Sequence, residues 1–355
     1  MASPIAITLG DPAGIGPEII AKAFRDAPEL LRGCFVAGDV ATLRRAAAIV
    51  QGAAGGVDLP VAEIAQPGEA LDAPPRCVPV LQVVEQAPLV PLGQVSAQAG
   101  RMAGDCVVWA ARAALRGELA ALVTAPLNKE ALSAAGEPYA RYPGHTELLQ
   151  AEAAAHLKLP IDALPVRMML ANDELRTVLV SIHLPLRAAL AQVTERNIAE
   201  TLRIAHQSVG AALQKAPRIA VAGLNPHAGE GGLFGREEID VIAPAIARAR
   251  AEGIDAQGPF APDTVFMRAR GFAEFDLVVA MYHDQGLIPV KYLGVEQGVN
   301  VTLGLPIVRT SPDHGTAFDI AGTGQADAAS LLAAVRVARW LAQEKTPAAR
   351  GVRAF

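Results

Sequence analysis

Continuous apolar runs recur along this chain, and segments with helical spacing lie between them. The clearest runs are Ile5–Leu9, Leu119–Thr124, Thr177–Ile182, Ile219–Ala222 and Leu277–Met281. A run without polar alternation is typical of a strand buried on both faces, as in a parallel sheet covered by helices. The alternation of strands and helices therefore predicts an α/β protein.

Two parts of the chain depart from this regular alternation. Residues 51–100 are rich in Pro, Gly and Ala, with apolar runs near 58–64 and 77–84 that we interpret as strands. Val166–Leu170 and Thr177–Ile182 are separated only by a short turn, so we expect them to pair directly.

Three histidines follow apolar strands: His183, His227 and His283. The carboxyl ends of neighbouring strands lie close together in such a sheet, so the three imidazoles can converge on one ion. Three neutral imidazoles suit Zn²⁺ or another borderline first-row metal and leave a position open for water or substrate. No HExxH or CxxC anchor accompanies them, so polar caps on the strands remain the alternative.

Cationic side chains lie in loops near the same predicted edge of the sheet: Lys129, Arg141, Lys291 and Arg309. They can clamp a phosphate or a carboxylate, although each alone can equally be a solvated surface charge. His145 and Thr146 open a predicted helix, whose free backbone N–H groups make an anion site. A simple threonine cap is the alternative there.

Composition narrows the class of protein. The 355 residues are 52% hydrophobic and 4% aromatic, with a net charge of −5 and no run of like charges, which argues against a nucleic-acid partner. The chain is long enough for two domains or one large α/β unit. Three scattered cysteines suggest buried thiols in a reducing compartment. We see neither a signal peptide nor a membrane span and expect a cytoplasmic protein.

A series of motifs resembles those of the 4-hydroxythreonine-4-phosphate dehydrogenase family. In chain order they are GDPAGIGPE, VTAPLNK, YPGHTE, SIHLPL, GLNPHAGEGGLFGREE, PDTVF, YHDQGLIPVKY and SPDHGTAFDIAGTG. The resemblance covers nearly the whole chain and is weakest over residues 51–95. The glycines of Gly10–Glu18 do not make the GxGxxG fingerprint of a classical Rossmann domain.

The resemblance implies a two-domain, three-layer α/β/α fold similar to the isocitrate and isopropylmalate dehydrogenases. Residues 1–140 and 306–355 would form an NAD-binding domain, and residues 141–305 a domain for metal, substrate and dimerisation. The loop His314–Gly324 would hold the adenosine part of the dinucleotide. The enzyme would be a homodimer with its active site at the subunit interface.

Site residues carry over by matching motif. The resemblance implies that His183, His227 and His283 bind a divalent metal, with Zn²⁺ favoured and Mg²⁺ or Co²⁺ as alternatives, and that Lys291 joins them in catalysis. The implied substrate contacts are His145, Thr146, Asp263, Lys291, Asn300 and Arg309. The implied cofactor contacts, to NAD or NADP, are Gly315, Thr316, Asp319, Gly322 and Gly324. We also expect Asp284 to fix the tautomer of the neighbouring imidazole.

The implied activity is a metal-dependent oxidation in pyridoxine 5'-phosphate (vitamin B6) biosynthesis. The substrate, 4-phosphohydroxy-L-threonine, would become 2-amino-3-oxo-4-phosphooxybutanoate, which loses CO₂ to give 3-amino-2-oxopropyl phosphate. Oxidation of D-threonate or D-erythronate 4-phosphate is the alternative within the family. A phosphometabolite-binding protein without catalysis, and a metal-dependent hydrolase or aldolase, are alternatives of other classes. No motif distinguishes an amine from a hydroxyl at C2 of the substrate.

Overall fold

A computed structural model of the chain describes residues 3–54 and 58–342. Its strands join in one sheet with the order β3-β4-β2-β1-β5-β12-β11-β6-β7-β10-β8-β9. The strands are β1 (Ile5–Thr8), β2 (Cys34–Gly38), β3 (Val61–Ile64), β4 (Val78–Gln82), β5 (Ala121–Thr124), β6 (Arg167–Ala171), β7 (Arg176–Leu179), β8 (Ile219–Ala222), β9 (Ala256–Phe260), β10 (Leu277–Ala280), β11 (Val299–Leu303) and β12 (Arg309–Pro312).

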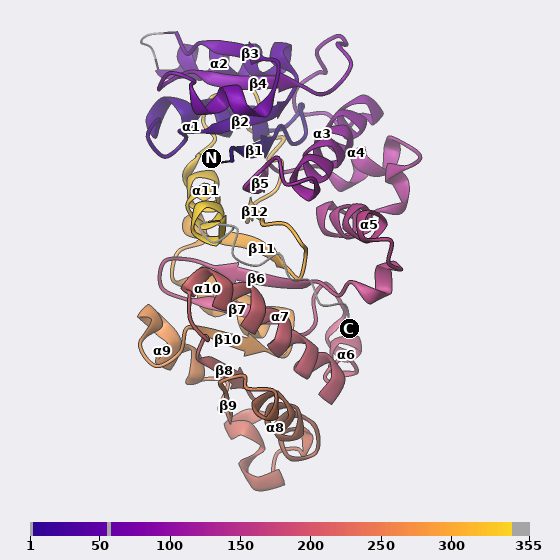
Figure 1. Cartoon of the computed structure of the whole chain (residues 1–355), viewed down its shortest axis with the longest axis vertical. Coiled ribbons are helices and arrows are strands. Elements are labelled where there is room, and N and C mark those ends of the chain that lie inside the picture. Colours follow the sequence, from indigo (N-terminus) through magenta and orange to yellow (C-terminus); the bar gives the residue numbers. More distant parts are fainter. Residues whose placement is uncertain (1–2, 55–57, 343–355) are drawn as a thin grey trace.

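Helices cover both faces of this sheet (Figure 1). The α-helices are α1 (Gly16–Asp26), α2 (Val40–Ala54), α3 (Ala97–Leu115), α4 (Lys129–Ala134), α5 (His145–Leu157), α6 (Leu186–Leu190), α7 (Glu195–Leu213), α8 (Ala243–Ala251), α9 (Val265–Ala269), α10 (His283–Tyr292) and α11 (Ala329–Ala342). Short 3₁₀ or π turns lie at Pro67–Leu71, Tyr139–Arg141, Ile161–Ala163, Pro226–Gly232, Glu238–Ile242, Arg270–Phe272 and Val295–Gln297.

The side chains of each strand alternate between the two helical layers. Ile5 and Ile7 pack in one core cluster with α1, α2, α7, α8 and α11, whereas Ala6 packs in a second with α3 and α5. Val278 belongs to a third cluster, which α9 and α10 cover. All four residues of β1 and of β10 are buried, as continuous apolar runs predict. The predicted three-layer α/β fold is confirmed.

The order of strands brings distant parts of the chain together at the middle of the sheet. Strands β1 to β5 lie on one side with β12, and β6 to β10 lie on the other with β11 (Figure 1). There β11 runs antiparallel to both β6 and β12, while β12 runs parallel to β5. The predicted pairing of β6 with β7 is confirmed as antiparallel, and β3 and β4 occupy the two runs interpreted as strands.

Two further expectations concern the environment of the chain. Among residues 3–54 and 58–342, no helix is long and apolar enough to cross a membrane. Cys34, Cys77 and Cys106 are free thiols, and all three are buried. Burial raises the pKa of the Cys34 thiol to about 11, which keeps it protonated and unreactive at neutral pH.

Candidate active site

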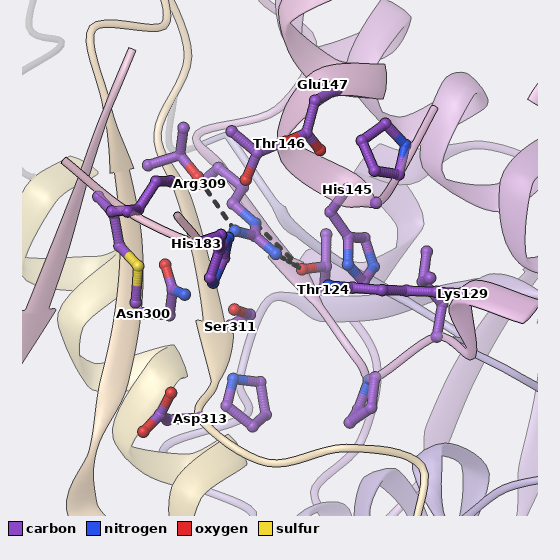
Figure 2. Close-up of a pocket in the computed structure, with 18 of the residues that line it drawn as sticks. Thr124, Lys129, His145, Thr146, Glu147, His183, Asn300, Arg309, Ser311 and Asp313 are labelled. Atoms are coloured by element: carbon purple, nitrogen blue, oxygen red, sulfur yellow. Dashed lines mark hydrogen bonds between the residues drawn. The ribbon is translucent and has the colours of Figure 1, made fainter. Parts of the chain in front are cut away.

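A cavity of about 670 Å³ lies where the two halves of the sheet meet. Its walls come from the end of β5, from β11 and β12, from the start of α5, and from the segment after β7 (Figure 2). Five predicted substrate or metal residues line it: His145, Thr146, His183, Asn300 and Arg309. The cavity thus lies at the carboxyl ends of parallel strands, where ligands bind in such sheets. Several of the side chains that line the cavity nevertheless come from the antiparallel strands at the centre of the sheet.

Arg309 is a buried cation in this cavity, with only 3% of its surface exposed. Its guanidinium donates to Thr124 Oγ1, at 2.7 and 3.1 Å, and to Thr302 Oγ1 at 3.0 Å. No ion pair to a carboxylate is formed by Arg309 within the described ranges. Burial lowers the pKa of the guanidinium to about 10, and the charge of Glu147 opposes that shift only in part. A buried, uncompensated cation is a strong binding site for an anion.

His145 adds a second group with an unused hydrogen-bonding atom. Its Nε2 is buried and has no hydrogen-bond partner. Burial, together with the charges of Arg309 and Lys129, lowers the pKa of His145 well below its usual value, although a hydrogen bond to the backbone of Ala125 opposes this. The imidazole is therefore neutral at physiological pH and can give or take one hydrogen bond. It stands in the first turn of α5, where free N–H groups also favour an anion.

Two of the three predicted metal ligands lie together. The ring centroids of His183 and His283 are 5.6 Å apart. Burial, followed by the charges of Lys129 and His283, lowers the pKa of His183, which favours the neutral form that binds metals. Asp284 Oδ1 lies 2.7 Å from His283 Nδ1 and so directs Nε2 away from the carboxylate. The expected contact between Asp284 and His283 is present.

His227 lies apart from this pair. Its ring packs near Phe234, with centroids 6.1 Å apart. Within the ranges that the structure describes, no three His, Cys, Asp or Glu side chains are placed to hold a metal ion together. Both His183 and His227 have left-handed backbones, with φ of 45° and 52°. Such a conformation is uncommon outside glycine, and its strain is often retained at functional sites.

The segment that carries His227 is anchored by a buried carboxylate. Glu238 Oε1 accepts hydrogen bonds from the N–H groups of Leu224 and Asn225, both at 2.7 Å, and Oε2 accepts from Asn225 Nδ2 at 3.0 Å. Residues 227–232 all have positive φ. A side chain at Gly229 would come within 2.7 Å of Glu238 Oε2. Glu238 therefore determines where His227 stands.

Two predicted substrate residues lie outside the main cavity. Lys291 Nζ forms an ion pair with Asp313 Oδ2 at 2.8 Å, and Asp313 itself lines the cavity. Asp263 lines a different hollow of about 430 Å³, beside Tyr282 and Asp284. Lys291 thus borders the cavity through Asp313, whereas Asp263 lies in the separate hollow beside Asp284.

The predicted cofactor loop begins at the rim of the cavity. His314 and Gly315 line it, and the rest of the loop runs from there toward α1. Gly322 and Gly324 have positive φ, of 86° and 68°, which a tight loop requires of glycine. Asp319 is exposed. The loop thus extends directly from the cavity that contains Arg309.

Comparison with known proteins identifies the family. The profile described as "Pyridoxal phosphate biosynthetic protein PdxA" matches residues 31–338. The chain belongs to this family. A "4-hydroxythreonine-4-phosphate dehydrogenase" of Beijerinckia indica is 52% identical over 328 residues, 92% of each chain. A "D-threonate 4-phosphate dehydrogenase" of Salmonella typhimurium is 46% identical over 343 residues, 95% of this chain and 98% of that one.

Solved structures of PdxA-family proteins share the fold. The 4-hydroxythreonine-4-phosphate dehydrogenase of Klebsiella pneumoniae matches with a TM-score of 0.84 at 41% identity, covering 96% of this chain and 100% of that one. The family inferred from the motifs is confirmed, and so is the prediction of an oxidoreductase.

Several residues of the cavity in this PdxA-family chain carry no clear signal in the sequence. Thr302 and Ser311 line it, and so does Asp313, the partner of Lys291. Thr302 lies inside the mostly apolar strand VNVTL, where nothing marks it as a ligand of Arg309. Asp313 is the first residue of the motif DHGTAFD, and its place in that motif could have marked it as a site residue.

Proposed function

We propose that this PdxA-family chain is an NAD(P)-dependent 4-hydroxythreonine-4-phosphate dehydrogenase. It would oxidise 4-phosphohydroxy-L-threonine to 2-amino-3-oxo-4-phosphooxybutanoate, which loses CO₂ to give 3-amino-2-oxopropyl phosphate for pyridoxine 5'-phosphate. The observation that carries the proposal is the cavity in which Arg309 has no ion-pair partner among the described residues and His145 Nε2 has no hydrogen-bond partner. A small, doubly anionic substrate suits these groups.

We propose that the three histidines hold a divalent metal, Zn²⁺ with Mg²⁺ or Co²⁺ as alternatives, and that His227 would have to approach the other two to complete the site. His183 and His283 present neighbouring imidazoles, and β8 leads to His227 directly beside β10. A carboxylate that accepts a hydrogen bond from Nδ1, as Asp284 can from His283, is the usual way to orient a metal-binding imidazole. When bound, such a metal lowers the pKa of the substrate alcohol and stabilises negative charge on its oxygen.

The chain's own residues would bind and orient the substrate. Arg309 and the first turn of α5 would hold one anionic group, and Asn300 lines the same cavity (Figure 2). His145 is neutral, so it can donate or accept a hydrogen bond with the substrate but adds no charge of its own. Lys291, next to Asp313, can reach a second anionic group at the rim. Fixing both ends of the substrate aims its C–H bond toward the dinucleotide loop.

We further propose that a dinucleotide binds at the loop 313–327, with Gly315, Thr316, Asp319, Gly322 and Gly324 as contacts. A bound dinucleotide would supply the hydride acceptor. The loop carries no Arg or Lys for a 2'-phosphate, which favours NAD over NADP. The assignment of residues 1–140 and 306–355 to this domain is part of the same proposal, and 343–355 lie outside the described residues.

We propose a homodimer whose active site is completed at the subunit interface. Large apolar side chains are exposed beside Asp263 and along α10: Met267 at 70%, Ile288 at 64% and Tyr292 at 91%. Exposed apolar groups of this size beside a predicted site indicate a contact surface. A partner there would bring additional polar groups to the histidines.

The free, buried cysteines suit a cytoplasmic location, which we also propose.

The amino substrate must be tested against its hydroxy counterparts, because the relatives include both kinds of enzyme. The purified protein is assayed for NAD(P)H formation with Zn²⁺, Mn²⁺ or Mg²⁺ and with 4-phosphohydroxy-L-threonine, D-threonate 4-phosphate or D-erythronate 4-phosphate. We expect the amino substrate to give the largest kcat/KM. Turnover of the hydroxy acids alone would assign the alternative activity.

A single variant tests the metal site separately from the binding of substrate and dinucleotide. His227→Ala should lose metal affinity and turnover together, whereas His206→Ala, a helical histidine of α7, should retain both. A His227→Ala enzyme that is fully active without metal would refute the three-histidine site. Dinucleotide and substrate binding without turnover under any metal would support the non-catalytic reading.

A further inference from the structure

The motif Gly10–Glu18 touches the proposed dinucleotide loop. The loop and the motif come from opposite ends of the chain. The N–H of Ile15 donates to the carbonyl of Thr316 at 3.0 Å, and Gly14 lies so close that a side chain there would come within 2.8 Å of the same oxygen. The motif therefore packs directly against the loop at Thr316.

The strongest of these contacts is made by Glu18, in the first turn of α1. The residue is only 1% exposed, and its carboxylate accepts two backbone hydrogen bonds from the loop. Oε1 accepts from the N–H of Gly322 at 2.5 Å, and Oε2 accepts from the N–H of Gly324 at 2.9 Å. One buried carboxylate thus satisfies two loop donors that would otherwise need water.

The two glycines are confined on their other side as well. Both have left-handed backbones, and a side chain at Gly322 would meet Leu92 at 2.7 Å. Lys22, one turn after Glu18, donates from Nζ to the carbonyl of Ala326 at 2.6 Å. Residues 322–326 are consequently tied to α1 by both a buried carboxylate and an ammonium.

We propose that Glu18 is a positioning residue for the dinucleotide, acting through the backbone of Gly322 and Gly324. This inference rests on the proposed function, because it takes the loop 313–327 as the dinucleotide site. Without the carboxylate, two N–H groups lose their acceptor and the loop relaxes toward solvent. A glutamine has one acceptor oxygen, and its amide N–H₂ would oppose the second backbone donor.

Glu18→Gln tests the proposal. We expect KM for NAD(P)⁺, and its Kd by calorimetry, to rise on the order of tenfold, since hydrogen bonds to a charged group are lost. Neither kcat at saturating dinucleotide nor KM for the phosphorylated substrate should change more than about twofold. Glu29→Gln, at an exposed glutamate just beyond α1, is the matched control and should behave as wild type.

Lys22→Met gives a second test that leaves the buried carboxylate in place. It should raise KM for NAD(P)⁺ in the same direction by a smaller factor. If Glu18→Gln binds the dinucleotide as tightly as wild type, the inference is wrong while the proposed function stands. If its losses in substrate and dinucleotide binding are equal and accompany a lower Tm, Glu18 is merely structural. A wild-type enzyme that binds no dinucleotide would overturn both proposals.

Discussion

Replacing Arg309 with methionine should make the protein a worse enzyme without making it a less stable one. The guanidinium is buried, donates to Thr124 and Thr302, and has no ion-pair partner within the described ranges. Methionine fills a similar length of space without a charge. The substitution therefore removes an anion-binding group and, at the same time, an unfavourable buried charge.

The magnitudes follow from the structure. The pKa of Arg309 falls from 12.5 to about 10 on folding. At 1.36 kcal/mol per unit, burying the charge costs about 3 kcal/mol, and this cost is present at every pH below about 10 because the group is protonated in both states. The two threonine hydroxyls lose a partner, at about 1 kcal/mol each. The free energy of unfolding should therefore rise by about 1 kcal/mol or stay unchanged.

Binding should change in the opposite direction. A charge-assisted contact to a buried anion contributes about 3 kcal/mol, so KM for the phosphorylated substrate should rise on the order of 100-fold. Inorganic phosphate should raise the Tm of the wild type and have little effect on Arg309→Met.

Arg167→Met is the matched control, because Arg167 lines the same cavity but pairs with Glu200 at 2.6 Å. It should lose stability, since Glu200 is left unpaired, and should retain more of its substrate binding. Denaturant unfolding compares the stability of the two variants, and steady-state kinetics compare their KM for the phosphorylated substrate. If Arg309→Met lost more than about 2 kcal/mol of stability and bound substrate normally, the reasoning would be refuted.

Three other predictions test the framework around the site. Burial raises the pKa of Asp11 to about 6, and hydrogen bonds from the backbone of Ala13 and Asn128 oppose this shift only in part. The charged form of Asp11 therefore destabilises the fold above that pH. In denaturant unfolding, Asp11→Asn should be more stable than the wild type by about 3 kcal/mol at pH 8, and the difference should vanish as the pH falls toward 4. Glu238→Gln should weaken Zn²⁺ binding by about tenfold in calorimetry, because the turn that carries His227 loses its charged acceptor; unchanged affinity would contradict this. Gly100→Ala should cost about 3 kcal/mol in unfolding, because its methyl group would overlap the carbonyl of Ala131, whereas Gly52→Ala meets open space and should be neutral or stabilising.

Local pattern predicted most of the secondary structure. Continuous apolar runs gave strands such as β1 and β10, and polar residues that follow strands, such as His183, marked the edge where the cavity lies. These features are local, because burial on both faces and the end of a strand are written in a few neighbouring residues. The motifs then identified the family and its class of reaction.

Tertiary structure decided which distant groups meet. Arg309 binds Thr124 across 185 residues, and Glu18 binds Gly322 across 304, because β12 and the loop after it return beside strands from the start of the chain. Spacing along the sequence contains no information on such pairings. It also could not show that His227 packs near Phe234 rather than with His183, since that depends on a left-handed turn anchored by a carboxylate farther along the chain.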